Sequence, residues 1–83
     1  LMKNIIVVTG GAGFVGSNLI EYFVKKTKYK IISYDNYSTG NKKNHIKNKR
    51  IIYLKANTKD ISKILKKVKK NIHSIFHFGE LQE

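Results

Sequence analysis

The chain has 83 residues, 41% of them hydrophobic and 27% charged, a composition typical of a small soluble globular domain. It contains no cysteine, which excludes a disulfide framework and a thiolate-based zinc site. Its apolar runs are much shorter than the about 20 residues that cross a bilayer, and the N-terminal run ends in glycines rather than in a signal-peptide cleavage site. These features predict a cytoplasmic protein.

The formal net charge of +12 would attract polyanions such as nucleic acids, acidic membranes and phosphate-bearing ligands. Of the 17 cationic side chains, however, only Arg50 is an arginine. Dedicated nucleic-acid readers rely on arginine for bidentate contacts to bases. We therefore expect neither a specific nucleic-acid partner nor a membrane partner, and a basic binder of either kind stays as the alternative.

Strand and helix patterns alternate along the first half of the chain. Residues 4–9 form a largely β-branched run bounded by glycine, which predicts a strand buried on both faces. Residues 14–26 predict an amphipathic helix, whose apolar stripe is Val15, Leu19, Ile20, Phe23 and Val24. Residues 30–34 predict a second strand, and the polar stretch 35–49 predicts a loop.

The alternation continues to the end of the chain. Residues 51–55 and 72–78 predict two more strands, with a helix between them. Asn57 is placed to cap that helix, and Asp60 supplies a carboxylate near its start. Alternating strands and helices predict parallel pairing with right-handed crossovers. The expected fold class is α/β, a partial Rossmann or doubly wound sheet with strand order 3-2-1-4.

A glycine-rich segment, T-G-G-A-G-F-V-G, occupies residues 9–16, where the first strand gives way to the first helix. It contains G-x-G-x-x-G at Gly11, Gly13 and Gly16, and also G-x-x-G-x-x-G starting at Gly10. In a dinucleotide fold, glycines allow the tight turn, the approach of the pyrophosphate and close helix–strand packing. The anion then lies at the helix N-terminus. The alternative is a plain glycine-rich turn.

Asp35 follows the second strand, 19 residues after Gly16. A dinucleotide fold places an acid about 20 residues after the glycine motif, where it binds the hydroxyls of the adenosine ribose. A carboxylate at this position also repels a 2′-phosphate and so favours NAD over NADP. The alternative is a solvated turn aspartate, because Asp35-Asn36 is also good turn chemistry.

Three segments together carry a family resemblance. Residues 9–19 (TGGAGFVGSNL), 35–40 (DNYSTG) and 76–80 (FHFGE) occur in the order of the chain. They resemble the opening segment, the segment after strand two and the strand-four segment of the extended short-chain dehydrogenase/reductase family. The resemblance is to its sugar-nucleotide epimerase and dehydratase branch. It implies NAD as cofactor and an isomerase or related role in nucleotide-sugar metabolism.

The resemblance also implies which residues meet the cofactor. Phe14 and Val15 would lie beside the pyrophosphate, Asp35 and Asn36 at the adenosine ribose, and Asn57 near the adenine. The position of Glu80 holds a small or apolar residue in many family members, so Glu80 has no implied role. The full implied set is Gly10, Gly11, Gly13, Phe14, Val15, Gly16, Asp35, Asn36, Ser38, Thr39, Asn57, Thr58, Phe78 and Gly79.

The catalytic Tyr-x-x-x-Lys of the family lies beyond strand four, so no catalytic residue is implied here. Tyr22 and Lys26 form such a string on the first helix, which is the wrong place for it. His73 and His77 are expected to pack structurally rather than to bind a metal, because no carboxylate or cysteine cluster accompanies them.

Residues 1–83 are therefore expected to be the N-terminal part of an NAD-binding Rossmann domain that lacks its remainder and its substrate domain. Such a chain would be inactive alone, and a sugar nucleotide would bind only to the longer parent. A stand-alone nucleotide-binding module without catalysis is the alternative. Neither the substrate nor the oligomeric state follows from the sequence.

Overall fold

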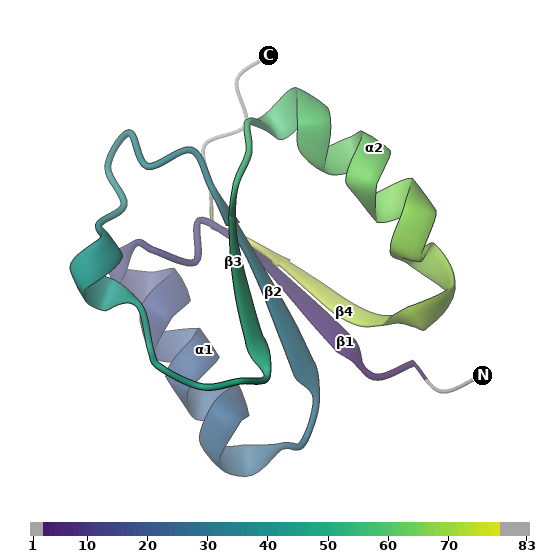
Figure 1. The fold of residues 1–83 in the computed structure, drawn as a ribbon, viewed down its shortest axis with the longest axis horizontal. Coiled ribbons are helices and arrows are strands. Elements are labelled where there is room, and N and C mark those ends of the chain that lie inside the picture. Colours follow the sequence, from purple (N-terminus) through teal and green to yellow (C-terminus); the bar gives the residue numbers. More distant parts are fainter. Residues whose placement is uncertain (1–2, 79–83) are drawn as a thin grey trace.

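The computed structural model describes residues 3–78, except for the side chain of Thr58, and shows a four-stranded parallel sheet with one helix on each face (Figure 1). The elements in chain order are β1 (Ile5–Thr9), α1 (Phe14–Lys26), β2 (Lys30–Asp35), β3 (Ile51–Lys55), α2 (Thr58–Val68) and β4 (Ile72–His77). Short 3-10 turns at Lys42–Asn44 and Lys69–Asn71 precede β3 and β4. The sheet order β3-β2-β1-β4 confirms the predicted topology.

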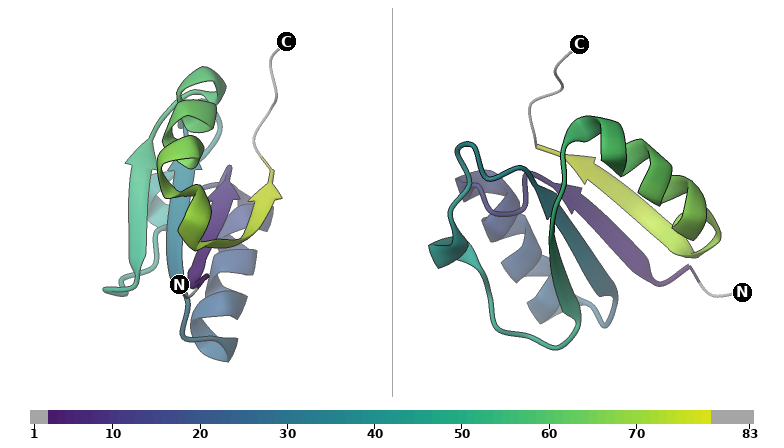
Figure 2. Two further views of the ribbon diagram at one scale, coloured as in Figure 1. Left: turned by 90° about the vertical axis from the view of Figure 1, so that its right-hand side faces the viewer. Right: turned by 45° about the horizontal axis from the view of Figure 1, so that its top comes forward.

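The central strand β1 pairs with β2 on one side and β4 on the other (Figure 2). Val7 lies opposite Ile32 of β2 and Ile75 of β4, and one irregularity in the β4 register falls between Ile5 and Ile6. Parallel strands end at the same edge of the sheet, so the segments after β1, β2 and β4 meet there. This carboxyl edge is where open α/β sheets bind ligands.

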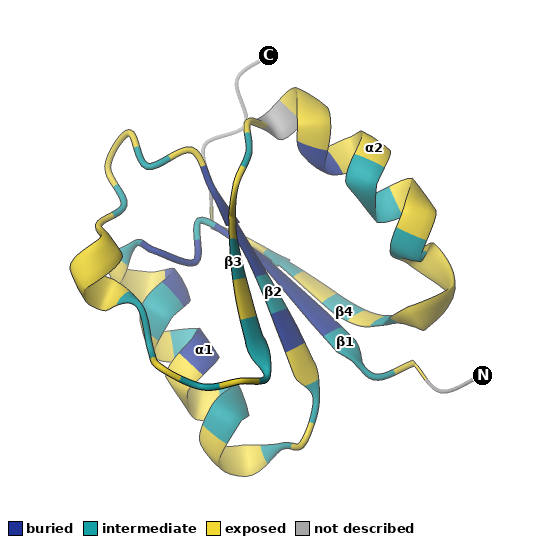
Figure 3. Cartoon of the chain, in the orientation of Figure 1, coloured by how far each residue is buried: buried dark blue, intermediate teal, exposed yellow. Residues whose placement is uncertain are grey.

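The core has two layers because β1 is buried on both faces, as its β-branched run predicted (Figure 3). On one face Ile6, Val8 and Ile31 pack with Ile20 of α1. On the other face a second cluster joins the sheet to α2 and consists of Val7, Tyr34 and Ile61. Burying one such side chain contributes about 1.5–3 kcal/mol.

The face that carries α2 is only partly covered in the described part of the chain. Ile52, Leu54 and Ile75 are exposed there. Each pairs across the sheet with a residue of the α2 layer, namely Ile32, Tyr34 and Val7 respectively. Neither described helix is long and apolar enough to cross a membrane.

Arg50, the last residue before β3, is hydrogen-bonded to the end of α1 and to the connection that follows it. Its guanidinium donates hydrogen bonds to the carbonyl oxygens of Val24 (2.7 Å), Thr27 (2.8 Å) and Tyr29 (3.1 Å). It thereby satisfies carbonyls at the C-terminus of α1 and complements the negative end of the helix dipole. The guanidinium of the only arginine of the chain thus makes hydrogen bonds within the fold.

Replacing Arg50 with alanine is expected to lower the free energy of unfolding by about 2 kcal/mol, because hydrogen bonds from a charged donor are lost and carbonyls are left unpaired. Arg50→Lys should recover only part of this, since one ammonium cannot reach the three carbonyls at once. Urea denaturation measures both changes. The neighbouring exposed Lys49→Ala is the control, and equal stability of Lys49→Ala and Arg50→Ala would contradict the assignment.

Candidate functional site: a cleft at the carboxyl edge of the sheet

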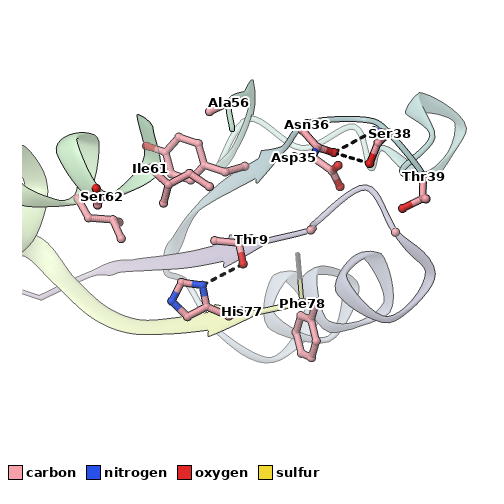
Figure 4. Close-up of a pocket in the computed structure, with 14 residues that line it drawn as sticks. Thr9, Asp35, Asn36, Ser38, Thr39, Ala56, Ile61, Ser62, His77 and Phe78 are labelled. Carbon is pink, nitrogen blue, oxygen red and sulfur yellow. Dashed lines mark hydrogen bonds between the residues drawn. The ribbon is translucent and has the colours of Figure 1, made fainter. Parts of the chain in front are cut away.

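A cleft of about 440 Å³ opens at the carboxyl edge of the sheet, between the strand ends and α2 (Figure 4). Half of its lining comes from residues that the sequence predicted as cofactor contacts. These are Gly10, Gly13, Asp35, Asn36, Ser38, Thr39 and Phe78. The structure therefore brings together residues from the glycine turn, from the end of β2 and the loop after it, and from the end of β4.

The glycine turn connects β1 to α1 in a tight backbone path. Gly10 adopts a φ of 72°, a left-handed conformation that glycine tolerates and other residues avoid. Its N–H donates to the Tyr34 carbonyl at 2.7 Å, and its own carbonyl accepts from the Gly13 N–H at 3.1 Å. Gly13 is the N-cap of α1, without a side-chain cap, and the first turn of α1 contains no acid. The positive end of the helix dipole therefore meets no capping side chain.

Gly16 and Gly11 support the cleft rather than line it. A Cβ on Gly16 would collide with the Gly10 carbonyl oxygen and lie 2.9 Å from the Gly10 carbonyl carbon and the Gly11 Cα. A Cβ on Gly11 would collide with the Ser33 hydroxyl, which is buried and has no hydrogen-bond partner among the described residues. Both glycines therefore permit close packing of the turn on its neighbours.

Asp35 ends β2 and is only 8% exposed. Its Oδ2 accepts a hydrogen bond from the Ala12 N–H at 3.0 Å, and its Oδ1 accepts one from the Tyr37 N–H at 2.8 Å. A Cβ on Gly40 would lie 2.6 Å from Oδ2, so a glycine is needed beside the carboxylate. The side chain thus makes a local turn contact and also lines the cleft.

Polar side chains continue along the cleft after Asp35 (Figure 4). The Asn36 Oδ1 accepts hydrogen bonds from the N–H and the hydroxyl of Ser38, both at 2.9 Å. Ser38 and Thr39 are exposed and contribute to the lining. This end of the cleft is rich in hydroxyl and carboxylate oxygen atoms.

The other predicted site residues lie outside the lining. Phe14 and Val15 are 81% and 56% exposed at the start of α1, so the placement of Val15 in the apolar stripe was wrong. The Asn57 Oδ1 accepts the Asp60 N–H at 3.0 Å, which confirms the predicted cap of α2. The Thr58 side chain, Gly79 and Glu80 lie outside the described residues.

Half of the lining residues were not predicted from the sequence. The missed residues come from strand ends and from α2, which spans the opening: Thr9, Tyr34, Ala56, Ile61, Ser62, Leu65 and His77. The Thr9 Oγ1 and the His77 Nδ1 are 3.1 Å apart, across β1 and β4. His77 is exposed rather than packed in the core, and the described residues form no cluster of metal-ligating groups. Their position at strand ends was the signal that could have found Thr9 and His77.

Tyr22 and Lys26 are exposed on α1, in the layer opposite α2, and neither lines the cleft. Burial raises the pKa of the Tyr34 phenol above its ordinary value. The cleft therefore combines an uncapped helix terminus, a fixed carboxylate and a partly apolar wall.

The parallel order β3-β2-β1-β4 and the glycine turn at the β1–α1 junction define a Rossmann-type α/β protein. More specifically, the chain belongs to the NAD dependent epimerase/dehydratase family, whose model matches residues 6–83. This assignment confirms the resemblance drawn from the glycine segment, the segment after β2 and the β4 segment.

Individual relatives agree with the family. The uncharacterized UDP-glucose epimerase YtcB of Bacillus subtilis is 35% identical over 86 residues, covering 92% of this chain and 26% of that protein. Among solved structures, an epimerase from Methanothermobacter thermautotrophicus superposes with a TM-score of 0.77 at 30% identity, covering 93% of this chain and 23% of its own. The dTDP-glucose 4,6-dehydratase of Bacillus anthracis, solved with NAD, also superposes with a TM-score of 0.77 at 30% identity. The match covers 94% of this chain and 26% of that protein. The chain thus spans about a quarter of each.

Proposed function

We propose that this chain binds NAD in the cleft and forms the amino-terminal part of the cofactor domain of a sugar-nucleotide epimerase or dehydratase. The observation that carries the proposal is the Asp35 carboxylate, which is held in the cleft by two backbone N–H groups. An acid in this position beside a glycine turn suits a nucleotide ribose next to a pyrophosphate.

The pyrophosphate would lie at the N-terminus of α1. Backbone N–H groups of the first turn, including those of Phe14 and Val15, would face it, and the helix dipole favours its negative charge. Gly13 lines the cleft and has no side chain to block this approach. The absence of acids in the first turn supports the assignment, because an acid there would compete with the phosphates.

The adenosine would lie toward β2 and α2. An ionised carboxylate offers about four lone-pair positions, so two remain on Asp35 for the ribose hydroxyls. The apolar side chains of Ala56, Ile61 and Leu65 would contact the adenine ring. Asn57 uses its Oδ1 for the cap, and the second lone pair of that oxygen could accept from the adenine amino group.

Bound NAD would supply a hydride acceptor for a sugar carbon. The residues of this chain would bind and orient the dinucleotide, with Thr9 lining the cleft at the end of β1 and His77 and Phe78 lining it at the end of β4. The proposal assigns none of the described residues to the sugar nucleotide, whose binding would depend on the rest of the parent enzyme.

Calorimetric titration of the chain with NAD tests the proposal. We expect saturable one-site binding, and we expect Gly13→Val to abolish it, because the added side chain would occupy the pyrophosphate position. A Cβ on Gly13 meets only the Gly10 oxygen, at 3.3 Å, so the fold should persist. The exposed Lys63→Ala is the control. Absence of NAD binding, or equal binding by Gly13→Val, would refute the proposal.

The chain by itself is expected to show no epimerase or dehydrogenase turnover. Hydride transfer from a sugar alcohol also needs a base within hydrogen-bond reach of the hydroxyl, and Tyr22 lies on the helix opposite α2. The assay incubates the chain with NAD and UDP-sugars and follows NADH absorbance and sugar products. Turnover that Tyr22→Phe abolishes would contradict both this expectation and the placement of the Tyr22–Lys26 string.

A further inference from the structure

The connection between β2 and β3 contains no α-helix, although it spans residues 36–50. Its only regular element is the 3-10 turn Lys42–Asn44 (Figure 1). Loops of this length inside a compact domain are usually either functional or disordered. Because residues at the start of this loop line the cleft, the contacts that hold the loop in place also affect the shape of the cleft.

Three half-buried aromatic side chains, two from the loop and one from β3, contact one another, and we call Tyr37, His45 and Tyr53 the aromatic clasp. The Tyr37 hydroxyl and the His45 Nε2 are 2.7 Å apart. The His45 ring stacks on the Tyr53 ring, with centroids 3.8 Å apart and planes at 8°. The Tyr53 hydroxyl in turn accepts the Ile46 N–H at 2.9 Å.

The clasp acts on Asp35 through the backbone of Tyr37. Tyr37 has a φ of 62°, a conformation that bulky residues avoid and that neighbouring contacts must therefore hold. Its N–H donates to the Asp35 Oδ1, while its hydroxyl bonds His45. The contact with His45 thus fixes the Tyr37 side chain, and the hydrogen bond from the Tyr37 N–H orients the Asp35 carboxylate.

The same loop also meets the glycine turn. The Asn41 N–H and the Asn44 Nδ2 both donate to the Ala12 carbonyl, at 3.0 and 2.8 Å. The Ala12 N–H donates to the other Asp35 oxygen, Oδ2. Both carboxylate oxygens are therefore oriented by peptide groups whose positions depend on the path of the loop.

We propose that Tyr37, His45 and Tyr53 are positioning residues that preorganise the Asp35 carboxylate for the adenosine ribose. The proposal rests on the proposed function, since it assigns these residues a role in dinucleotide binding at the same site. None of the three lines the cleft, so they act through the loop rather than by touching the ligand. A site that is ordered before binding loses less conformational entropy when the ligand arrives.

The test compares NAD with its analogue that lacks the adenosine 2′-hydroxyl. The wild-type chain should bind NAD about tenfold or more tightly than the analogue, because the lost hydrogen bond is made to a charged acceptor. Tyr37→Phe and His45→Gln should each weaken NAD binding about three- to tenfold and bring the affinity ratio toward one. A merely structural role would weaken both ligands equally and leave the ratio unchanged.

Matched controls are available at the other end of the sheet and on α1. His73 packs against Tyr29 at the start of β4, with ring centroids 4.7 Å apart, and Tyr22 is exposed on α1. His73→Gln and Tyr22→Phe should keep the wild-type affinities and ratio. Amide hydrogen exchange in the ligand-free chain gives a second readout, in which the Tyr37 N–H should exchange faster only in the clasp variants.

Clasp variants that keep the wild-type affinity ratio and Tyr37 exchange rate, in a chain that binds NAD, would overturn the positioning role alone. A wild-type chain that does not bind NAD, or does not distinguish it from the analogue, would overturn the proposed ribose site and the clasp's role with it. Tyr37→Phe removes a single oxygen and keeps the ring, so it decides the question if His45→Gln does not fold.

Discussion

Gly16→Ala is expected to lower the free energy of unfolding by about 3 kcal/mol and to abolish dinucleotide binding. The new methyl group would collide with the Gly10 carbonyl oxygen and press on two further backbone atoms of the turn. A backbone cannot move aside as a flexible side chain can, so either α1 must shift away from β1 or the turn must open. Folded domains of this size are stable by only a few to about ten kcal/mol, which makes this loss severe.

Gly13→Ala is the matched control, because it adds the same methyl group three residues earlier. There the methyl group would meet only the Gly10 oxygen, at 3.3 Å, and Gly13 has a φ of −81°, which alanine adopts easily. Its free energy of unfolding should change by less than about 1 kcal/mol. Urea denaturation followed by circular dichroism compares the two, and equal stabilities would show that Gly16 is not needed for close packing.

Asp35→Ala is expected to weaken NAD binding about 10- to 100-fold and to remove the preference for NAD over NADP. In the wild-type chain the carboxylate would accept hydrogen bonds from the ribose and repel a 2′-phosphate. Its removal leaves the Ala12 and Tyr37 N–H groups without their acceptor, and these donors would then favour an anion. NADP binding should therefore improve while NAD binding declines.

Titration of both dinucleotides onto both proteins measures this change. Glu21→Gln is the control, because it also removes one negative charge but breaks only the exposed ion pair with Lys25 on α1. Its effect on either affinity should be small, as exposed ion pairs contribute at most about 1 kcal/mol. Equal or tighter NADP binding by the wild-type chain, or an unchanged preference in Asp35→Ala, would disprove the ribose assignment.

The local patterns of the sequence determined the elements and their order. The apolar spacing of residues 14–26 and the run at 51–55 predicted α1 and β3 with the bounds that the structure has. The cap of α2 was predicted from Asn57, because an Asn side chain at a helix start accepts a hydrogen bond from an N–H of the first turn. The alternation of strands and helices predicted parallel pairing, and the doubly wound topology that this alternation matches predicted the strand order. Periodicity, helix caps and connection rules depend on residues that are close together in the chain, so they can be recognised in a single sequence.

Only the tertiary structure decided which residues meet across the sheet. The sequence contains two overlapping glycine patterns, and the fold shows what each glycine does. Gly10 forms the turn, Gly13 is the N-cap of α1 and Gly16 packs against backbone atoms of the turn. Gly11 packs on Ser33. The lining by Ile61 and Leu65 depends on where α2 crosses the sheet.

Contacts between residues far apart in the chain could not be predicted from the sequence either. Thr9 and His77 meet through the register of β1 and β4, Arg50 reaches the end of α1, and His45 stacks on Tyr53 across a loop. Each contact joins positions that have no fixed spacing in the chain. Strand register, helix placement and loop path bring them together, and these are properties of the packed molecule as a whole.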